Sequence, residues 1–152
     1  MLYVTRKGFS LIELLVVMGM MSILLSIGGL SLGSMRNDTK LDLVSSEIRS
    51  ELLRIQIEKT NGKNVGIFFD TDRYVYFMGD SYTEGDPTNE ETNLPSNMVF
   101  SERTFLNNIA RFDNVTGYLK TYILPSHVIL SPTVGGETRT ISVNEWGMIE
   151  IN

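Results

Sequence analysis

The sequence predicts an α+β fold, in which one long N-terminal helix precedes a body of antiparallel strands. Residues 14–32 contain no charged side chain, and apolar residues continue at helical spacing through residues 41–55. From residue 63 onward, short runs rich in β-branched and aromatic residues alternate with turn-forming residues. Because the strands follow the helix and do not alternate with further helices, the pattern indicates α+β with antiparallel sheets.

The uncharged run has the length of a membrane span. Its 19 residues, 14–32, would form a helix of about 28 Å, close to the thickness of a bilayer core. Arg6 and Lys7 precede the run and favour a cytoplasmic N-terminus, which places the rest of the chain outside the cytoplasm. We therefore expect residues 9–35 to form a transmembrane helix, with Glu13 at its edge.

The helix is expected to continue through residues 36–62 as an amphipathic segment. An apolar stripe at spacings of three or four would lie on a sheet, and it consists of Leu41, Val44, Ile48, Leu52 and Ile55. Charged residues such as Glu47, Arg49 and Arg54 are expected on the other side. Asn61 and Gly62 predict the end of the helix.

Residues 63–152 are expected to form a β-rich globular head. The sequences "VGIFFD" and "RYVYFM" predict a hairpin with a short Asp-Thr-Asp turn. Further strands are expected at residues 98–101, 117–124, 128–130, 139–143 and 148–151. The last two flank "NEWG", a tight turn in which Gly147 would take a positive φ.

Composition excludes several classes of function. The net charge is −5, and from Arg36 onward 11 Lys and Arg against 17 Asp and Glu give −6, which should repel nucleic acid. The chain has no cysteine, so disulfides, thiol nucleophiles and cysteine metal sites are absent. His127 is the single histidine, and no G-x-S-x-G or phosphate-binding loop occurs. We expect a protein that is not an enzyme and needs no cofactor.

The N-terminal residues "KGFSLIELLVVM" resemble the class III signal of type IV pilins and pseudopilins. The resemblance implies that a prepilin peptidase removes residues 1–8 as a leader by cutting between Gly8 and Phe9, and methylates Phe9. It also implies that the transmembrane helix of residues 9–35 is an assembly helix and that Glu13 serves assembly. Within a bundle of apolar helices, the carboxylate of Glu13 could pair with the new Phe9 amine of a neighbouring subunit, and each charge would offset the desolvation of the other.

Small residues form a second pattern in the same segment. Their spacings of 3, 4, 3 and 4 place them within about 80° of one helix face, where they would let another helix approach closely. They are Gly19, Ser22, Ser26, Gly29 and Gly33. We expect this stripe to serve helix packing.

The order of elements narrows the resemblance. "LRIQIEKTNGKNVGIFFDTDRYVYF" followed by "RTISVNEWGMIEI" is similar to the GspH/FimT family of minor pseudopilins. This implies a single-pass protein of the cytoplasmic membrane with its head outside. Its partners would be other pilin or pseudopilin subunits, in a pilus or a type II secretion filament.

Two other functions are compatible with the sequence. A competence pilin would bind DNA through a basic C-terminal region, but the chain ends in the acidic "EWGMIEIN". The other alternative is an unprocessed, membrane-anchored extracytoplasmic protein.

The sequence of the acidic segment, residues 79–97, is compatible with more than one role. It contains no Lys or Arg and is expected to be a solvated loop. The alternatives are a contact for a partner subunit or a Ca²⁺ site built from Asp80, Glu84 and Asp86.

Overall fold

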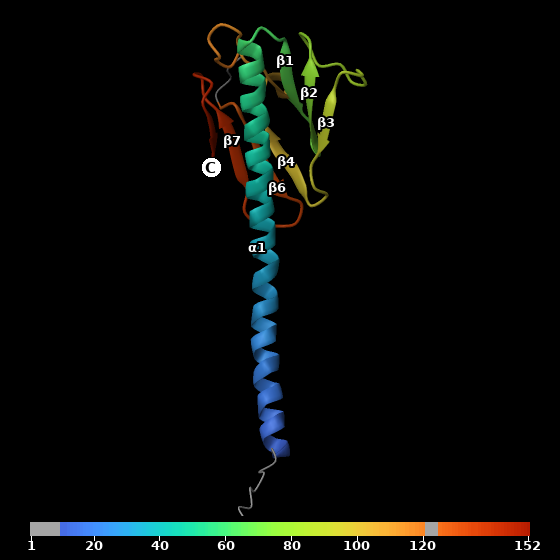
Figure 1. The fold of residues 1–152 in the computed structure, drawn as a ribbon, viewed down its shortest axis with the longest axis vertical. Coiled ribbons are helices and arrows are strands. Elements are labelled where there is room, and N and C mark those ends of the chain that lie inside the picture. Colours follow the sequence, from blue (N-terminus) through green and yellow to red (C-terminus); the bar gives the residue numbers. More distant parts are fainter. Residues whose placement is uncertain (1–9, 121–124) are drawn as a thin grey trace, which may run out of the picture. The chain divides into compact units, whose positions relative to one another are not determined.

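The computed structural model describes residues 10–120 and 125–152, and their side chains except those of residues 27–37. The chain divides into two compact units, Met1–Arg36 and Asn37–Asn152, and helix α1 (Leu11–Thr60) contributes to both (Figure 1). In the part of the chain that the structure describes, no helix combines the length and the apolar character needed to cross a membrane.

The head part of α1 packs through the predicted stripe. Leu41, Val44, Ile48, Leu52 and Ile55 are all buried, which confirms the expected amphipathic segment. The helix ends in a Schellman motif, in which the Gly62 amide donates to the Lys59 carbonyl (2.9 Å) and the Lys63 amide to that of Glu58 (3.0 Å). Gly62 takes φ = +84°, a value that costs a residue with a side chain more than it costs glycine.

The opposite side of this helix differs from the expectation. Charged side chains do not fill it, because Leu43, Leu53 and Ile57 lie exposed there. Residues such as Glu47 and Arg49 flank this uncharged strip on either side. The head part of α1 therefore carries apolar residues on two opposite faces.

The first sheet contains the predicted hairpin of β1 (Val65–Phe69) and β2 (Arg73–Met78), paired with Ile67 opposite Tyr76. The strand order is β3-β2-β1-β5, and all neighbours are antiparallel. β3 (Glu90–Asn93) lies inside the acidic segment that was expected to be a loop, so that expectation was wrong for these residues. β5 (Ile109–Ala110) was not predicted either, since two residues give no periodic signal.

The second sheet has the order β4-β6-β7-β8 and is also antiparallel. Its strands are β4 (Met98–Arg103), β6 (His127–Pro132), β7 (Arg139–Val143) and β8 (Ile149–Ile151). All four overlap strands expected from the sequence. The turn between β7 and β8 has Gly147 at φ = +77°, as predicted. A Cβ there would lie 2.4 Å from the Gly117 carbonyl oxygen, so glycine is also required by the close approach of the two loops.

The strand expected at residues 117–124 is not observed in its described part. Residues 117–120 make one isolated bridge, Leu119 opposite Phe112, and residues 121–124 lie outside the described set. The Asp113 carboxylate accepts the amides of Val115 and Thr116, which folds the preceding residues into a turn. The turn brings residues 118–120 back beside residues 111–113, so the described part of the expected strand makes only this short pairing.

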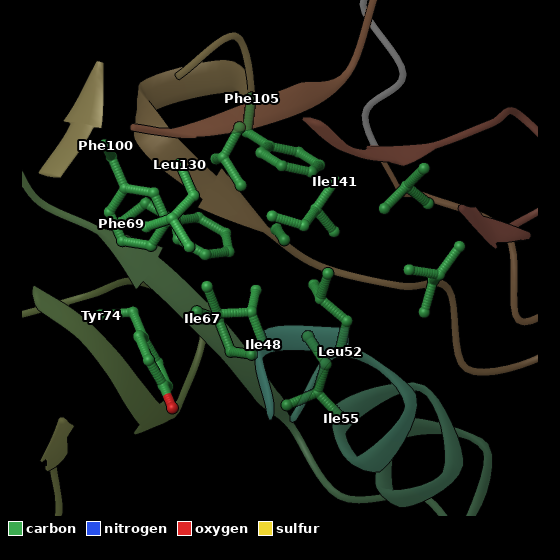
Figure 2. Close-up of a cluster of buried hydrophobic side chains, with 14 of the residues drawn as sticks. Ile48, Leu52, Ile55, Ile67, Phe69, Tyr74, Phe100, Phe105, Leu130 and Ile141 are labelled. Atoms are coloured by element: carbon green, nitrogen blue, oxygen red, sulfur yellow. The ribbon is translucent and has the colours of Figure 1, made fainter. Parts of the chain in front are cut away.

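One hydrophobic core joins the helix to both sheets, which confirms the α+β class. Figure 2 shows Ile48, Leu52 and Ile55 of α1 pointing toward side chains from the two sheets. Those labelled from the sheets and their loops are Ile67, Phe69, Tyr74, Phe100, Phe105, Leu130 and Ile141. Phe69 of the first sheet meets Phe100 of the second edge to face, with ring centroids 5.4 Å apart.

Candidate assembly site

The N-terminal end of α1 is closed by its own side chains. The Ser10 amide donates to Glu13 Oε2 (3.0 Å), and the Ile12 amide donates to Ser10 Oγ (3.3 Å). Together these bonds cap the helix much as a capping box does, with Ser10 Oγ accepting the amide of Ile12 in place of that of Glu13, and they satisfy amides that have no partner within the helix. Glu13 thus has a partner within its own chain. Gly8 and Phe9, the residues of the expected cleavage site, lie outside the described set.

Sequence reasoning missed this cap although its signal was present. "SLIE", residues 10–13, has Ser and Glu at the spacing of a capping box directly before an apolar run. The carboxylate of Glu13 therefore caps its own helix, a task separate from the expected pairing with a cation of another subunit. The two tasks need different chemistry, because an amide side chain can also cap, whereas pairing with a cation at full strength requires a negative charge.

The first turns of α1 expose every large apolar side chain that they carry. Each is more than half exposed in the isolated chain. They are Leu11, Ile12, Leu14, Leu15, Val16, Val17, Met18, Met20, Met21, Ile23, Leu24 and Leu25. Contiguous apolar surface of this kind marks a site that another apolar partner covers, a protein or a membrane.

The small residues on this segment have no free polar group where they are described. Ser22 Oγ donates to the Met18 carbonyl and Ser26 Oγ to the Ser22 carbonyl, each at 2.8 Å. A Cβ added at Gly19 would meet no atom within 4 Å. The face at Gly19, Ser22 and Ser26 is therefore shallow, and its two serine hydroxyls already donate hydrogen bonds within the helix. Gly29 and Gly33 belong to residues 27–37, outside the side-chain description.

The carboxylates expected at a Ca²⁺ site have separate partners. Asp80 accepts a hydrogen bond from Asn64 Nδ2 (2.8 Å), Glu84 lies 3.6 Å from Arg73, and Asp86 accepts the Thr88 amide (2.8 Å). Among the side chains described, no three of His, Cys, Asp and Glu form a group that could hold a metal ion. The structure does not bring the predicted ligands together.

The other acids of this segment are also engaged. Glu90 pairs with Arg54 of α1 (3.1 Å), and Glu91 pairs with Arg73 of β2 (3.0 Å). The segment has no cation of its own, so its partners come from distant parts of the sequence. The first pair ties β3 to α1 and the second ties it to β2, and together they offset the charge of an acidic stretch that forms a strand.

His127 serves the second sheet. Its Nδ1 lies 3.3 Å from Thr104 Oγ1 and its Nε2 lies 3.4 Å from Glu102. These contacts link β6 to β4 and the residue that follows it.

Two tyrosines of β2 bind carboxylates of α1. The Tyr74 hydroxyl donates to Glu47 (2.9 Å) and the Tyr76 hydroxyl donates to Glu58 (2.5 Å). The hydrogen bond from Tyr76 lowers the pKa of Glu58, and burial raises the pKa of Tyr76. These bonds orient the helix on the first sheet.

The lowered pKa of Glu58 predicts acid sensitivity. A carboxyl whose folded pKa is lowered contributes stability above its unfolded pKa, here the ordinary 4.5, and loses it as the pH falls through the folded pKa. Tyr76→Phe removes the bond that lowers this pKa, so we expect a smaller loss of unfolding free energy between pH 5 and acidic pH. Denaturant titrations of the full chain at a series of pH values measure this. Tyr118→Phe, at a residue that is 40% exposed, is the control. An unchanged acid dependence in Tyr76→Phe would contradict the assignment.

Comparison with known proteins identifies the N-terminal segment. Residues 5–29 match the family model described as the prokaryotic N-terminal methylation motif. No curated protein and no solved structure shows significant similarity to the chain. The match covers the segment that contains Gly8, Phe9 and the Ser10–Glu13 cap. The motif supports a type IV pilin-like protein that is processed by a prepilin peptidase and assembles with other pilins.

Proposed function

We propose that the chain is a minor pilin or pseudopilin subunit of a type IV pilus-like or type II secretion filament, and that it has no enzymatic role. The observation that carries the proposal is the methylation motif at residues 5–29. The exposed apolar surface of α1 supports it, because this surface needs a cover in the working protein. The order of a helix followed by a hairpin and a second closing hairpin supports a GspH/FimT-like subunit.

In this proposal the apolar segment has two successive partners. Before assembly, the uncharged residues 14–32 lie in the cytoplasmic membrane with the head outside the cytoplasm. After a prepilin peptidase cuts between Gly8 and Phe9, other pilin helices replace the lipid. The face that carries Gly19, Ser22 and Ser26 would allow close helix approach in both settings.

Glu13 would link processing to assembly. Cleavage gives Phe9 a free amine directly before Ser10, whose amide Glu13 already accepts in the isolated chain. In a water-free bundle, an amine and a carboxylate both need partners, and a pair between neighbours fixes their axial register. On assembly, Glu13 would either keep its hydrogen bond from the Ser10 amide or exchange it for the Phe9 amine of a neighbouring subunit.

The mature N-terminus tests the proposal most directly. The full chain is expressed in a bacterium that has a prepilin peptidase, and its N-terminal peptide is analysed by mass spectrometry. We expect a peptide that begins at Phe9 and carries one added methyl group. Gly8→Ala provides the matched control, in which Met1 or the following residues remain.

Other starting points would overturn the proposal. A wild-type chain that begins at Met1 would support the unprocessed, membrane-anchored alternative. A chain that begins beyond Gly33 would indicate a secreted protein without an assembly helix.

A further inference from the structure

We infer that a cavity in the head binds a carboxylate group that is carried on a short apolar chain, with Lys120 as its ion-pair partner. The cavity has a volume of about 240 Å³. Its walls come from the loop after β2, from the short turn η1 (Leu106–Asn108), from β5 and from the loop that follows β5. The inference goes beyond the proposed filament role and does not depend on it.

Two cations of the cavity wall lie directly opposite each other on antiparallel segments. The Lys120 amide donates to the Arg111 carbonyl (2.7 Å), next to the bridge between Phe112 and Leu119. Side chains at opposite positions of such a pairing lie on the same face, where like charges destabilise it. The side chains of Arg111 and Lys120 both line the cavity. An anion bound there would offset their repulsion.

A third cation is close to this pair. Lys59 of α1 is only 7% exposed, and its Nζ donates to Asn64 Oδ1 (2.5 Å). Arg111 Nη2 donates to the same oxygen (2.6 Å), so two charged groups share one neutral acceptor. Burial, and after it the charges of Arg111 and Lys120, lower the pKa of Lys59. The three cations therefore act on one another.

The nearby carboxylates do not balance these cations. Asp80 Oδ1 lies 3.5 Å from Arg111 Nη2, and Asp113 already accepts two backbone amides of its own turn. Three cations against two carboxylates leave one positive charge in excess, in a part of the chain whose net charge from Arg36 onward is −6. A monocarboxylate matches this excess. A phosphate group, with a charge of about −1.5 to −2, would exceed it and would meet Asp80.

Lys120 is the cation that a ligand can reach. It is exposed, and its ammonium has no ion pair within the described residues. Arg111, by contrast, already donates to the Asp80 and Gly79 carbonyls as well as to Asn64. We therefore expect Lys120 to make the direct ion pair, while the charges of Arg111 and the buried lysine act from further away.

The rest of the wall suits a short apolar chain. Leu106, which is 43% exposed, and Ile109 both line the cavity, together with the polar residues Ser81 and Asn107. A volume of 240 Å³ corresponds to about eight water molecules. This is room for a carboxylate with a branched chain of leucine size. A free short-chain acid and the last residue of a polypeptide both offer this chemistry.

Nuclear magnetic resonance of the ¹⁵N-labelled full chain tests the inference. The protein is held in detergent micelles at pH 7 and low salt and is titrated with 4-methylpentanoate. We expect saturable shifts of the Ser81, Asn107 and Lys120 amides, and no saturable shift with the neutral 4-methylpentanamide. Equal binding of the amide overturns the inference. So does a titration with the acid that shows no saturation up to about 50 mM, because the affinity would then be too weak for a specific site.

Two substitutions of exposed residues should change the affinity in opposite directions. Lys120→Gln removes the direct ion pair and should weaken binding by about 10-fold. Asp80→Asn removes the competing charge but keeps an oxygen for Asn64 and Arg111, and it should tighten binding several-fold. Lys40→Gln is the matched control, since it removes an exposed lysine of α1 that does not line the cavity. An effect of Lys40→Gln as large as that of Lys120→Gln would mean that only net charge matters, and would contradict the site.

Two further ligands test the apolar wall and the choice of anion. Leu106→Ala should weaken binding of 4-methylpentanoate several-fold and leave binding of acetate unchanged. An equal loss for both acids would show that the apolar wall has no role. Inorganic phosphate that binds more tightly than 4-methylpentanoate would overturn the assignment of a monocarboxylate.

The source of the carboxylate is distinguished with a glycine-rich pentapeptide that ends in leucine. If the peptide binds about as tightly as the free acid, and its C-terminal amide does not bind, the cavity accepts a polypeptide C-terminus. If only the free acid binds, the ligand is a small molecule. None of these titrations depends on processing at Phe9, so failure of the site and failure of the proposed function give separate results.

Discussion

Glu13→Gln is expected to lower incorporation of the subunit into filaments by about 100-fold, although it preserves the start of the helix. Glutamine can occupy the third position of a capping box, so the bond from the Ser10 amide survives. The substitution removes only the charge that would pair with the Phe9 amine of a neighbour. Leaving one member of a buried ion pair unpaired costs about 3–5 kcal/mol, which corresponds to at least a 100-fold change in an equilibrium.

The measurement is the ratio of assembled to membrane-bound subunit, by immunoblot of sheared filaments and membranes. Glu13→Asp keeps the charge and serves as the matched control, with partial incorporation expected. Glu13→Leu removes both the cap and the charge and should assemble no better than Glu13→Gln. Normal incorporation of Glu13→Gln would show that capping alone accounts for this residue.

Leu52→Ala is expected to destabilise the head by about 2–5 kcal/mol, because it empties a site that is fully enclosed between α1 and the sheets. Figure 2 shows Leu52 among the core side chains, and its exposed fraction is 0%. The loss should lower Tm by roughly 10 °C for a domain of this size. Unfolding of the full chain in detergent can be followed by fluorescence of Trp146, the single tryptophan, which packs edge to face on Tyr118.

The neighbouring residue supplies the control. Leu53→Ala makes the same chemical change one position along, at a side chain that is 39% exposed on the outer side of the helix. Its cost should stay below about 1 kcal/mol. Equal losses for the two variants would mean that the helix does not present the face described here to the core.

Periodicity and turn chemistry were enough to predict much of the fold. The buried stripe of α1, the stop at Gly62, the first hairpin and the positive φ of Gly147 all follow from signals within short continuous stretches of the sequence. Local signals also misled, since residues 117–120 make a single bridge where a strand was expected and residues 90–93 form a strand where a loop was expected. The helix cap at Ser10 and Glu13 was available in the sequence and was overlooked.

The sequence by itself determined the chemistry of the N-terminal segment: a basic start, Gly8 before Phe9, one acid and a long uncharged run. These features are local, so the order of residues expresses them completely. Only the tertiary structure decided that β3 is a strand, since Arg54 and Arg73 come from other elements to offset its acids. It also decided which apolar residues of α1 remain uncovered. Leu52 and Leu53 are the same amino acid at adjacent positions, and the sheets bury one while leaving the other exposed.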